Sequence, residues 1–198
     1  MKKRRAAFWV AGFILLSVVG LHLIVTQLLV EEDTNGVATH YVIENWAGSK
    51  SQFDEAILVC EKTEGSDVAT IIFEHLFQDT LSRREVIEAA WDAGFDTSHL
   101  KLIPVPQREP KTLNIASAVI DSASAWGWTH LTLVTAQLHT ARSKKAYQYH
   151  TRNKSISVSV VGVPFLGVSS RNWFLSWEGY ETVFEELTKT VYYAVMVY

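Results

Sequence analysis

After residue 39, short apolar runs alternate with segments in which apolar residues recur at helical spacing. An unbroken apolar run is typical of a strand buried on both faces, and recurrence at three and four residues is typical of an amphipathic helix. Strands are predicted at residues 40–43, 68–73, 100–105, 131–135 and 156–163. Helices are predicted at residues 51–62, 82–93, 113–123, 141–150 and 180–191. The alternation predicts an α/β domain with a mostly parallel five-stranded sheet and helices on both faces.

The last predicted helix has the clearest apolar stripe. It consists of residues at i, i+3, i+4, i+7 and i+11, namely Tyr180, Val183, Phe184, Leu187 and Val191. Three charged residues, Glu181, Glu185 and Lys189, lie off this stripe. The pattern predicts an amphipathic helix.

The N-terminal segment has a different pattern. Four basic residues at positions 2–5 precede a run without charged side chains at positions 6–30. A bilayer requires about 20 apolar residues in a helix, and a secretory signal has a shorter apolar core followed by a small-residue cleavage site. No such site follows this run, so we expect an uncleaved anchor in the cytoplasmic (inner) membrane, with the basic residues inside. The predicted organisation is a cytoplasmic tail at 1–5, a transmembrane helix at 6–30, a short linker at 31–38 and an extracytoplasmic domain at 39–198.

Composition narrows the possible functions. The net charge of the chain is −3, and no basic patch follows the predicted anchor. We therefore expect no nucleic-acid partner. The single cysteine, Cys60, cannot form an internal disulfide and has the helical spacing of a core residue. The histidines show no zinc-ligand spacing, and the sequence has no Gly-rich phosphate loop and no G-x-S-x-G motif. No metal is therefore predicted, and no cofactor or reaction is indicated.

Polar residues that follow the predicted strands are the candidates for a site. In an open parallel sheet, ligands bind beyond the carboxyl ends of the strands, near the point where strand order reverses. The candidate proton-transfer residues are Glu44, after the first strand, and His139, after the fourth. The candidate ligand-binding residues are Trp46, Thr112, Asn114, Arg142, Ser143, Trp173 and Glu178. Arg142 and the helix that begins near Ala141 suit an anionic group such as phosphate.

Most of these candidates also have a purely structural interpretation. Glu44 could cap a helix or pair with a lysine, and His139 could be a hydrogen-bonded loop histidine. Thr112 fits an N-cap, Asn114 fits a solvent-facing position, and Trp173 fits a packing residue. The sequence alone leaves both interpretations open.

Four segments together resemble the YdcF-like proteins, the SanA/ElyC group of the cell envelope. Residues 42–46, VIENW, resemble the "VVEGW" strand end of that family, and residues 133–143 resemble its "VT…H..RS" segment. Residues 111–116 lie where members carry an "RTY..A"-like helix entry, and residues 172–179 are similar to the "RDWW…SEG" block. Two segments depart from the pattern: Asn45 replaces a glycine, and residues 73–77 replace a Thr-Gly-Gly turn.

The resemblance implies a Rossmann-like three-layer α/β sandwich, often attached to one transmembrane helix, with a role in envelope or exopolysaccharide biogenesis. The expected partners are the lipid bilayer and a phosphorylated or lipid-linked glycan. The leading hypothesis is that the domain binds or processes such a metabolite. The alternative is a non-catalytic accessory or scaffold subunit of an envelope protein complex, which the missing Gly-Gly turn favours.

Overall fold

The structure, a computed structural model of the chain, describes residues 2–33, 40–44, 50–60, 67–73, 83–92, 96–106 and 108–196. At its centre is a parallel five-stranded sheet in the order β3-β2-β1-β4-β5. The strands are β1 (His40–Ile43), β2 (Asp67–Phe73), β3 (Leu100–Val105), β4 (His130–Ala136) and β5 (Ser157–Val163). The predicted parallel sheet is therefore confirmed, with the ends of each strand within one residue of their expected bounds.

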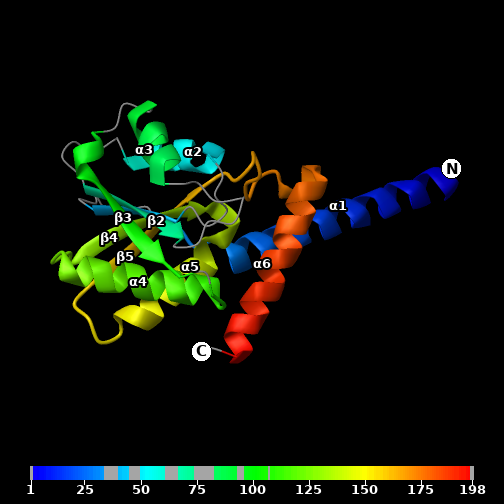
Figure 1. Cartoon of the computed structure of the whole chain (residues 1–198). Coiled ribbons are helices and arrows are strands. Elements are labelled where there is room, and N and C mark those ends of the chain that lie inside the picture. Colours follow the sequence, from blue (N-terminus) through cyan, green and yellow to red (C-terminus); the bar gives the residue numbers. More distant parts are fainter. Residues whose placement is uncertain are drawn as a thin grey trace.

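Helices cover both faces of the sheet (Figure 1). One face is covered by α2 (Lys50–Cys60) and α3 (Arg83–Asp92), and the other by α4 (Lys111–Ala125) and α5 (Thr140–Thr151). Short 3₁₀ turns are η1 (Thr97–His99), η2 (Gln137–His139) and η3 (Trp173–Leu175). This is a Rossmann-like α/β sandwich, in which the strand order reverses between β1 and β4.

Two further helices pack at one end of this sandwich. They are α1 (Lys2–Leu29) and α6 (Trp177–Met196). Figure 1 shows α1 extending away from the domain, while α6 crosses α1 beside the domain. Val25 and Leu29 of α1 and Val183 of α6 share an apolar cluster with Leu138 and Trp173. The last turns of α1 are thus part of the domain's packing. Within the part of the chain that the structure describes, no helix meets the length and hydropathy of a membrane span.

The described start of the predicted linker is hydrogen-bonded to the domain. The backbone N–H of Glu31 donates to Thr140 Oγ1 at 2.9 Å. Glu32 Oε1 accepts from the backbone N–H of Gly162 at 3.1 Å, where a larger residue would overlap Glu32 and Gln137. Asp33 accepts from the backbone N–H of Val160 at 2.9 Å. Residues 34–38 of the predicted linker, Asn45, and residues 74–77 of the second family departure lie outside the described residues.

The apolar stripe of α6 does not form the face that packs on the domain. Tyr180, Phe184 and Val191 are exposed, and of the five stripe residues only Val183 is fully buried. The inward face instead carries Gly179, Val183, Glu186 and Tyr193. Gly179 lies so close to η3 that a Cβ atom there would overlap the carbonyl of Trp173. The amphipathic helix is confirmed, but most of its stripe faces solvent, because α6 packs on the domain through the side that carries Gly179 and Glu186.

Candidate functional site

Glu44 lies at the carboxyl end of β1, where the strand order reverses. Its backbone N–H donates to Val134 of β4 at 2.9 Å, which fixes the residue beside the neighbouring strand. The residue is only 1% exposed. Its Oε2 accepts a hydrogen bond from Ser143 Oγ at 2.6 Å and lies 3.7 Å from His139 Nε2. Glu44 thus joins β1 to α5 through a buried carboxylate.

His139 ends η2, directly after β4, and is 2% exposed. Its imidazole lies between two carboxylates, with Glu44 near Nε2 and Glu186 Oε2 at 3.0 Å from Nδ1. Arg142 Nη2 also lies 2.8 Å from Nδ1, so this nitrogen either donates to Glu186 or accepts from Arg142, depending on the tautomer. A histidine with carboxylates on both sides can take up or release a proton within the site.

Arg142 and Glu186 form a buried ion pair with two parallel hydrogen bonds. Arg142 Nε donates to Glu186 Oε2 at 3.0 Å, and Nη2 donates to Oε1 at 2.9 Å. Nη1 donates to Thr112 Oγ1 at 2.5 Å, and the guanidinium lies 5.3 Å from the ring centroid of Tyr193. The pair connects α4, α5 and α6 around the histidine. Such a paired geometry fixes the orientation of both side chains.

The charges around Glu186 shift its titration. Burial alone would raise the pKa of the Glu186 carboxyl, but His139 and Arg142 together hold it well below its ordinary value of 4.5. A carboxyl whose pKa is lower in the folded state contributes stability above its unfolded pKa, and loses that contribution as the pH falls.

The free energy of unfolding is therefore expected to decrease as the pH falls below 4.5, the ordinary pKa of a glutamate. The measurement is urea unfolding of the full chain in mild detergent, from pH 7 down to pH 3. The Glu186→Gln variant lacks the titrating group, so its stability should depend less on pH over this range. Equal pH dependence of the two proteins would contradict the assignment.

One oxygen of Glu44 is not satisfied by any described residue. Glu44 Oε1 and the hydroxyl of Tyr147 are both buried without a hydrogen-bond partner among the described residues. Burial, and then the charge of Glu44, raise the pKa of Tyr147 well above its ordinary value. An unpaired buried carboxylate oxygen costs free energy. Its retention is more typical of a functional group than of a structural one.

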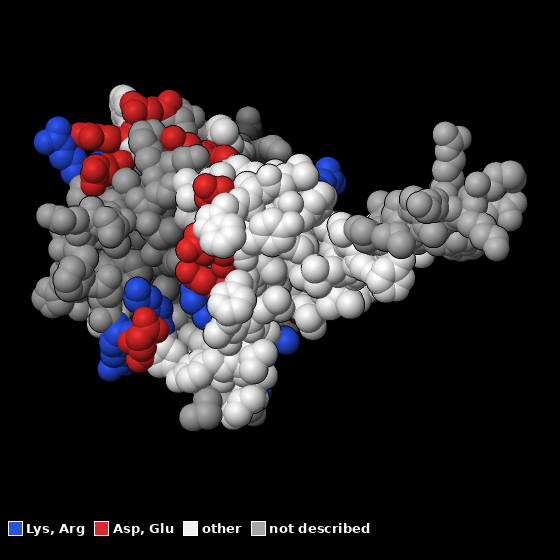
Figure 2. All heavy atoms as spheres, turned by 90° about the vertical axis from the view of Figure 1, so that its right-hand side faces the viewer, with Lys and Arg blue, Asp and Glu red and all other residues white. Residues whose placement is uncertain are grey.

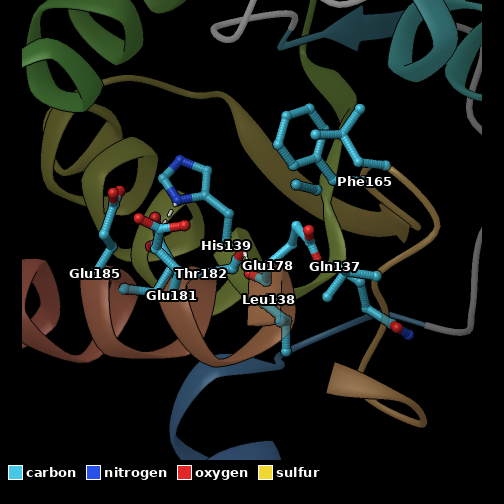
Figure 3. Close-up of a pocket in the computed structure, with 12 residues that line it drawn as sticks. Gln137, Leu138, His139, Phe165, Glu178, Glu181, Thr182 and Glu185 are labelled. Atoms are coloured by element: carbon cyan, nitrogen blue, oxygen red, sulfur yellow. Dashed lines mark hydrogen bonds and ion pairs between the residues drawn. The ribbon is translucent and has the colours of Figure 1, made fainter. Parts of the chain in front are cut away.

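Two pockets open on either side of His139. The first, of about 210 Å³, lies against α6 and includes Glu178, Glu181 and Glu185 (Figure 3). The second, of about 410 Å³, lies at the start of α4 and includes Lys111, Arg142 and Lys189. His139 lines both. The first pocket therefore has an acidic wall, and the second has a basic one.

The structure brings most of the predicted site residues together. Glu44, His139, Arg142, Ser143 and Thr112 form one connected buried cluster. Glu178 lines the first pocket beside them. Among the described residues, no group of three or more histidine, cysteine, aspartate or glutamate side chains is arranged to hold a metal ion.

Two predicted residues that the structure describes do not join this cluster. Asn114 Nδ2 donates to the backbone carbonyls of Arg108 and Pro110, so it stabilises the loop before α4. Trp173 is buried in the apolar cluster of α1 and α6, where it stacks on His22 at 6.3 Å between ring centroids. Neither residue lines either of the two pockets described above. Trp46 lies outside the described residues.

Glu186 is the site residue that sequence reasoning did not identify. It lies three residues after Val183 and seven residues before Tyr193, on the same face of the helix. A charged residue at a core spacing is a signal of a buried ion pair. The more hydrophobic stripe on the other side of α6 concealed it.

The comparisons with known proteins do not assign the chain to a family. No family model matches the chain, and no curated protein shows significant similarity to it. Among solved structures, the chain is similar to UDP-GlcNAc 2-epimerase from Neisseria meningitidis bound to UDP-GlcNAc, with a TM-score of 0.40 and 11% identity. The match covers 76% of this chain and 38% of the epimerase chain.

Proposed function

We propose that this protein is a single-pass membrane protein whose α/β domain lies outside the cytoplasm and binds or processes a phosphorylated or lipid-linked envelope metabolite. The uncharged run at positions 6–30, after a basic cluster, supports the anchor. Side chains of α1 beyond its contact with the domain, such as Phe13 and Leu16, are exposed and apolar. The resemblance to YdcF-like proteins supports the role in the envelope.

The second pocket supports an anionic ligand. Lys111, Arg142 and Lys189 line it, and Glu109 is the one carboxylate among its lining residues. The pocket also lies at the N-terminus of α4, a helix of 15 residues, whose first N–H groups favour negative charge. Tyr192 and Tyr193 add aromatic surface. This combination suits a phosphate group joined to an apolar or sugar moiety.

The observation that carries the proposal is the position of His139. It borders the basic pocket and has a carboxylate on each side, Glu44 and Glu186. His139 can therefore transfer a proton to or from a ligand held in this pocket, and the two carboxylates orient its imidazole ring. The site lies at the reversal of strand order, where α/β proteins bind their ligands.

Phosphate recognition is tested by ligand binding to the full chain in phospholipid nanodiscs. A polyprenyl phosphate should bind more tightly than the matching polyprenol, because only the phosphate meets the lysines. Replacing both Lys111 and Lys189 by glutamine should weaken binding of the phosphate by about tenfold or more, since a hydrogen bond to a charged group contributes about 1.5–3 kcal/mol.

The control for this test is Lys154→Gln. Lys154 pairs with Asp121 of α4, follows α5, and is absent from the lining of the pocket, so binding should be unchanged. Equal affinity for the phosphate and the alcohol, or equal effects of the two sets of substitutions, would contradict phosphate recognition.

The alternative is a non-catalytic accessory subunit of an envelope complex. The deep burial of Glu44 and His139 favours it, because both are at most 2% exposed. The exposed apolar surface of α6 favours it as well. The two functions predict different effects of substituting His139.

A further inference from the structure

The outward side of α6 presents a continuous apolar surface. It consists of Trp177, Tyr180, Phe184, Val191 and Val195, all exposed, and is called here the α6 apolar face. Trp177, Phe184 and Val195 are each more than 70% exposed, with values of 76%, 72% and 75%. Side chains of this size are seldom grouped on a surface without a partner.

Packing of the domain does not account for this face. The inward side of α6 already contacts the domain through Val183, Glu186 and Tyr193. The charged residues Glu178, Glu181 and Glu185 lie along one flank, where they line the first pocket. The opposite flank carries Leu187, which packs on the cluster that contains Val25 and Leu29 of α1. The apolar face thus borders α1, and the carboxylates lie on the other side.

The α6 apolar face continues onto α1. Leu21, Ile24 and Leu28 of α1 are exposed next to the turns that pack in the domain. Figure 2 shows uncharged surface running from α6 onto the protruding α1, with carboxylates along its border. Because α6 crosses α1 (Figure 1), a membrane surface through which α1 passes can also run along the length of α6.

We infer that the α6 apolar face lies in the headgroup region of the bilayer, beside the point where α1 enters it. This inference rests on the anchor in the proposed function. An amphipathic helix binds in this way by burying its apolar side a short distance into the interface. Trp177, Tyr180 and Tyr192 are of the residue types enriched at that depth.

A bilayer fits this surface better than a second copy of the chain. The exposed apolar side chains of α6 and α1 form one surface, so their occupant must be apolar along both helices. The lipid around α1 satisfies that requirement without another protein. In this orientation the first pocket, beside Glu178 and Glu181, opens next to the membrane surface.

The test places a fluorescent probe on this face of the full chain in nanodiscs. Cys60 is the single cysteine and is buried, so Phe184→Cys provides one accessible thiol, and the unsubstituted chain measures background labelling. The matched control is Trp91→Cys on α3, because Trp91 and Phe184 are both 72% exposed. Lipids brominated near the top of the acyl chain should quench the probe at 184 at least about twofold more than the probe at 91.

Two results would overturn the inference. Equal quenching at the two positions would show that the face does not enter the bilayer. Protection of the probe at 184 from aqueous iodide without quenching by lipid would show that protein covers the face, as in a dimer.

Both results leave the anchor intact if the chain stays with membranes after a carbonate wash. Release of the chain by that wash would instead refute the anchor itself, and with it the inference. The two failures are therefore distinguishable.

Discussion

Replacing Arg142 by methionine is expected to lower the free energy of unfolding by about 3–5 kcal/mol, the cost of removing one partner from a buried ion pair. Glu186 is 3% exposed and receives two hydrogen bonds from Arg142. Without the guanidinium, its carboxylate would remain buried with His139 Nδ1 at 3.0 Å and Lys189 Nζ at 3.8 Å as its remaining close partners. The measurement is urea unfolding of the full chain in mild detergent at neutral pH.

Two controls separate loss of the pair from loss of packing. The double variant Arg142→Met, Glu186→Met removes both charges and should recover most of the stability, because apolar residues of similar volume replace such pairs at little cost. Arg84→Met removes an arginine from an exposed pair with Glu88 and should change stability little. A double variant no more stable than Arg142→Met would show that the ion pair is not the cause.

Under the catalytic function, replacing His139 by glutamine is expected to abolish complementation, because a positioned proton-transfer group contributes about 10²–10⁴-fold to the rate. Glu186 keeps its two bonds to Arg142 in this variant, so the fold should persist. Glu44→Gln should have a similar effect, because it removes the charge beside Nε2. The measurement is complementation of cells that lack the protein, with the level of folded protein in the membrane measured in parallel.

The matched control is His130→Gln, at the opposite end of β4, where His130 contacts Ser157 at 2.7 Å. This variant should complement fully. Full complementation by both His139→Gln and Glu44→Gln, at normal protein levels, would refute the catalytic function and support the accessory one. Under the accessory function, substitutions on the α6 apolar face should impair complementation more than those at His139.

The local pattern of the chain was sufficient for most of the fold. In the run Leu131–Val134, apolar side chains lie on both faces of the strand, Leu131 and Leu133 on one and Val134 on the other, as expected for a strand covered on both faces. The regular alternation of strands with helices then implied that the strands are parallel. Because ligands bind beyond the carboxyl ends of parallel strands, Glu44 and His139 were predicted to share a site although they are 95 positions apart in the chain. Their 3.7 Å separation follows from the adjacency of β1 and β4.

Two predicted site residues lie outside the buried cluster for the same physical reason. Trp173 and Asn114 follow or begin the expected elements, but their side chains contact α1 and the loop before α4 instead of the strand ends. Position along the chain locates a residue near an edge of the sheet. It does not determine the direction of the side chain, which depends on the packing of later segments.

The helix α6 shows most clearly which features follow from the local sequence and which depend on tertiary contacts. Its sequence determined that it is helical and amphipathic, since periodicity and propensity act within a few residues. Its orientation was decided by tertiary contacts: Gly179 allows close approach to η3, and Arg142 binds Glu186 across 44 positions. The sequence by itself thus determined the order of elements and the end of the sheet where polar groups gather. Only the tertiary structure decided that a glutamate completes the cluster while the aromatic stripe stays outside, because a buried ion pair depends on which surfaces meet.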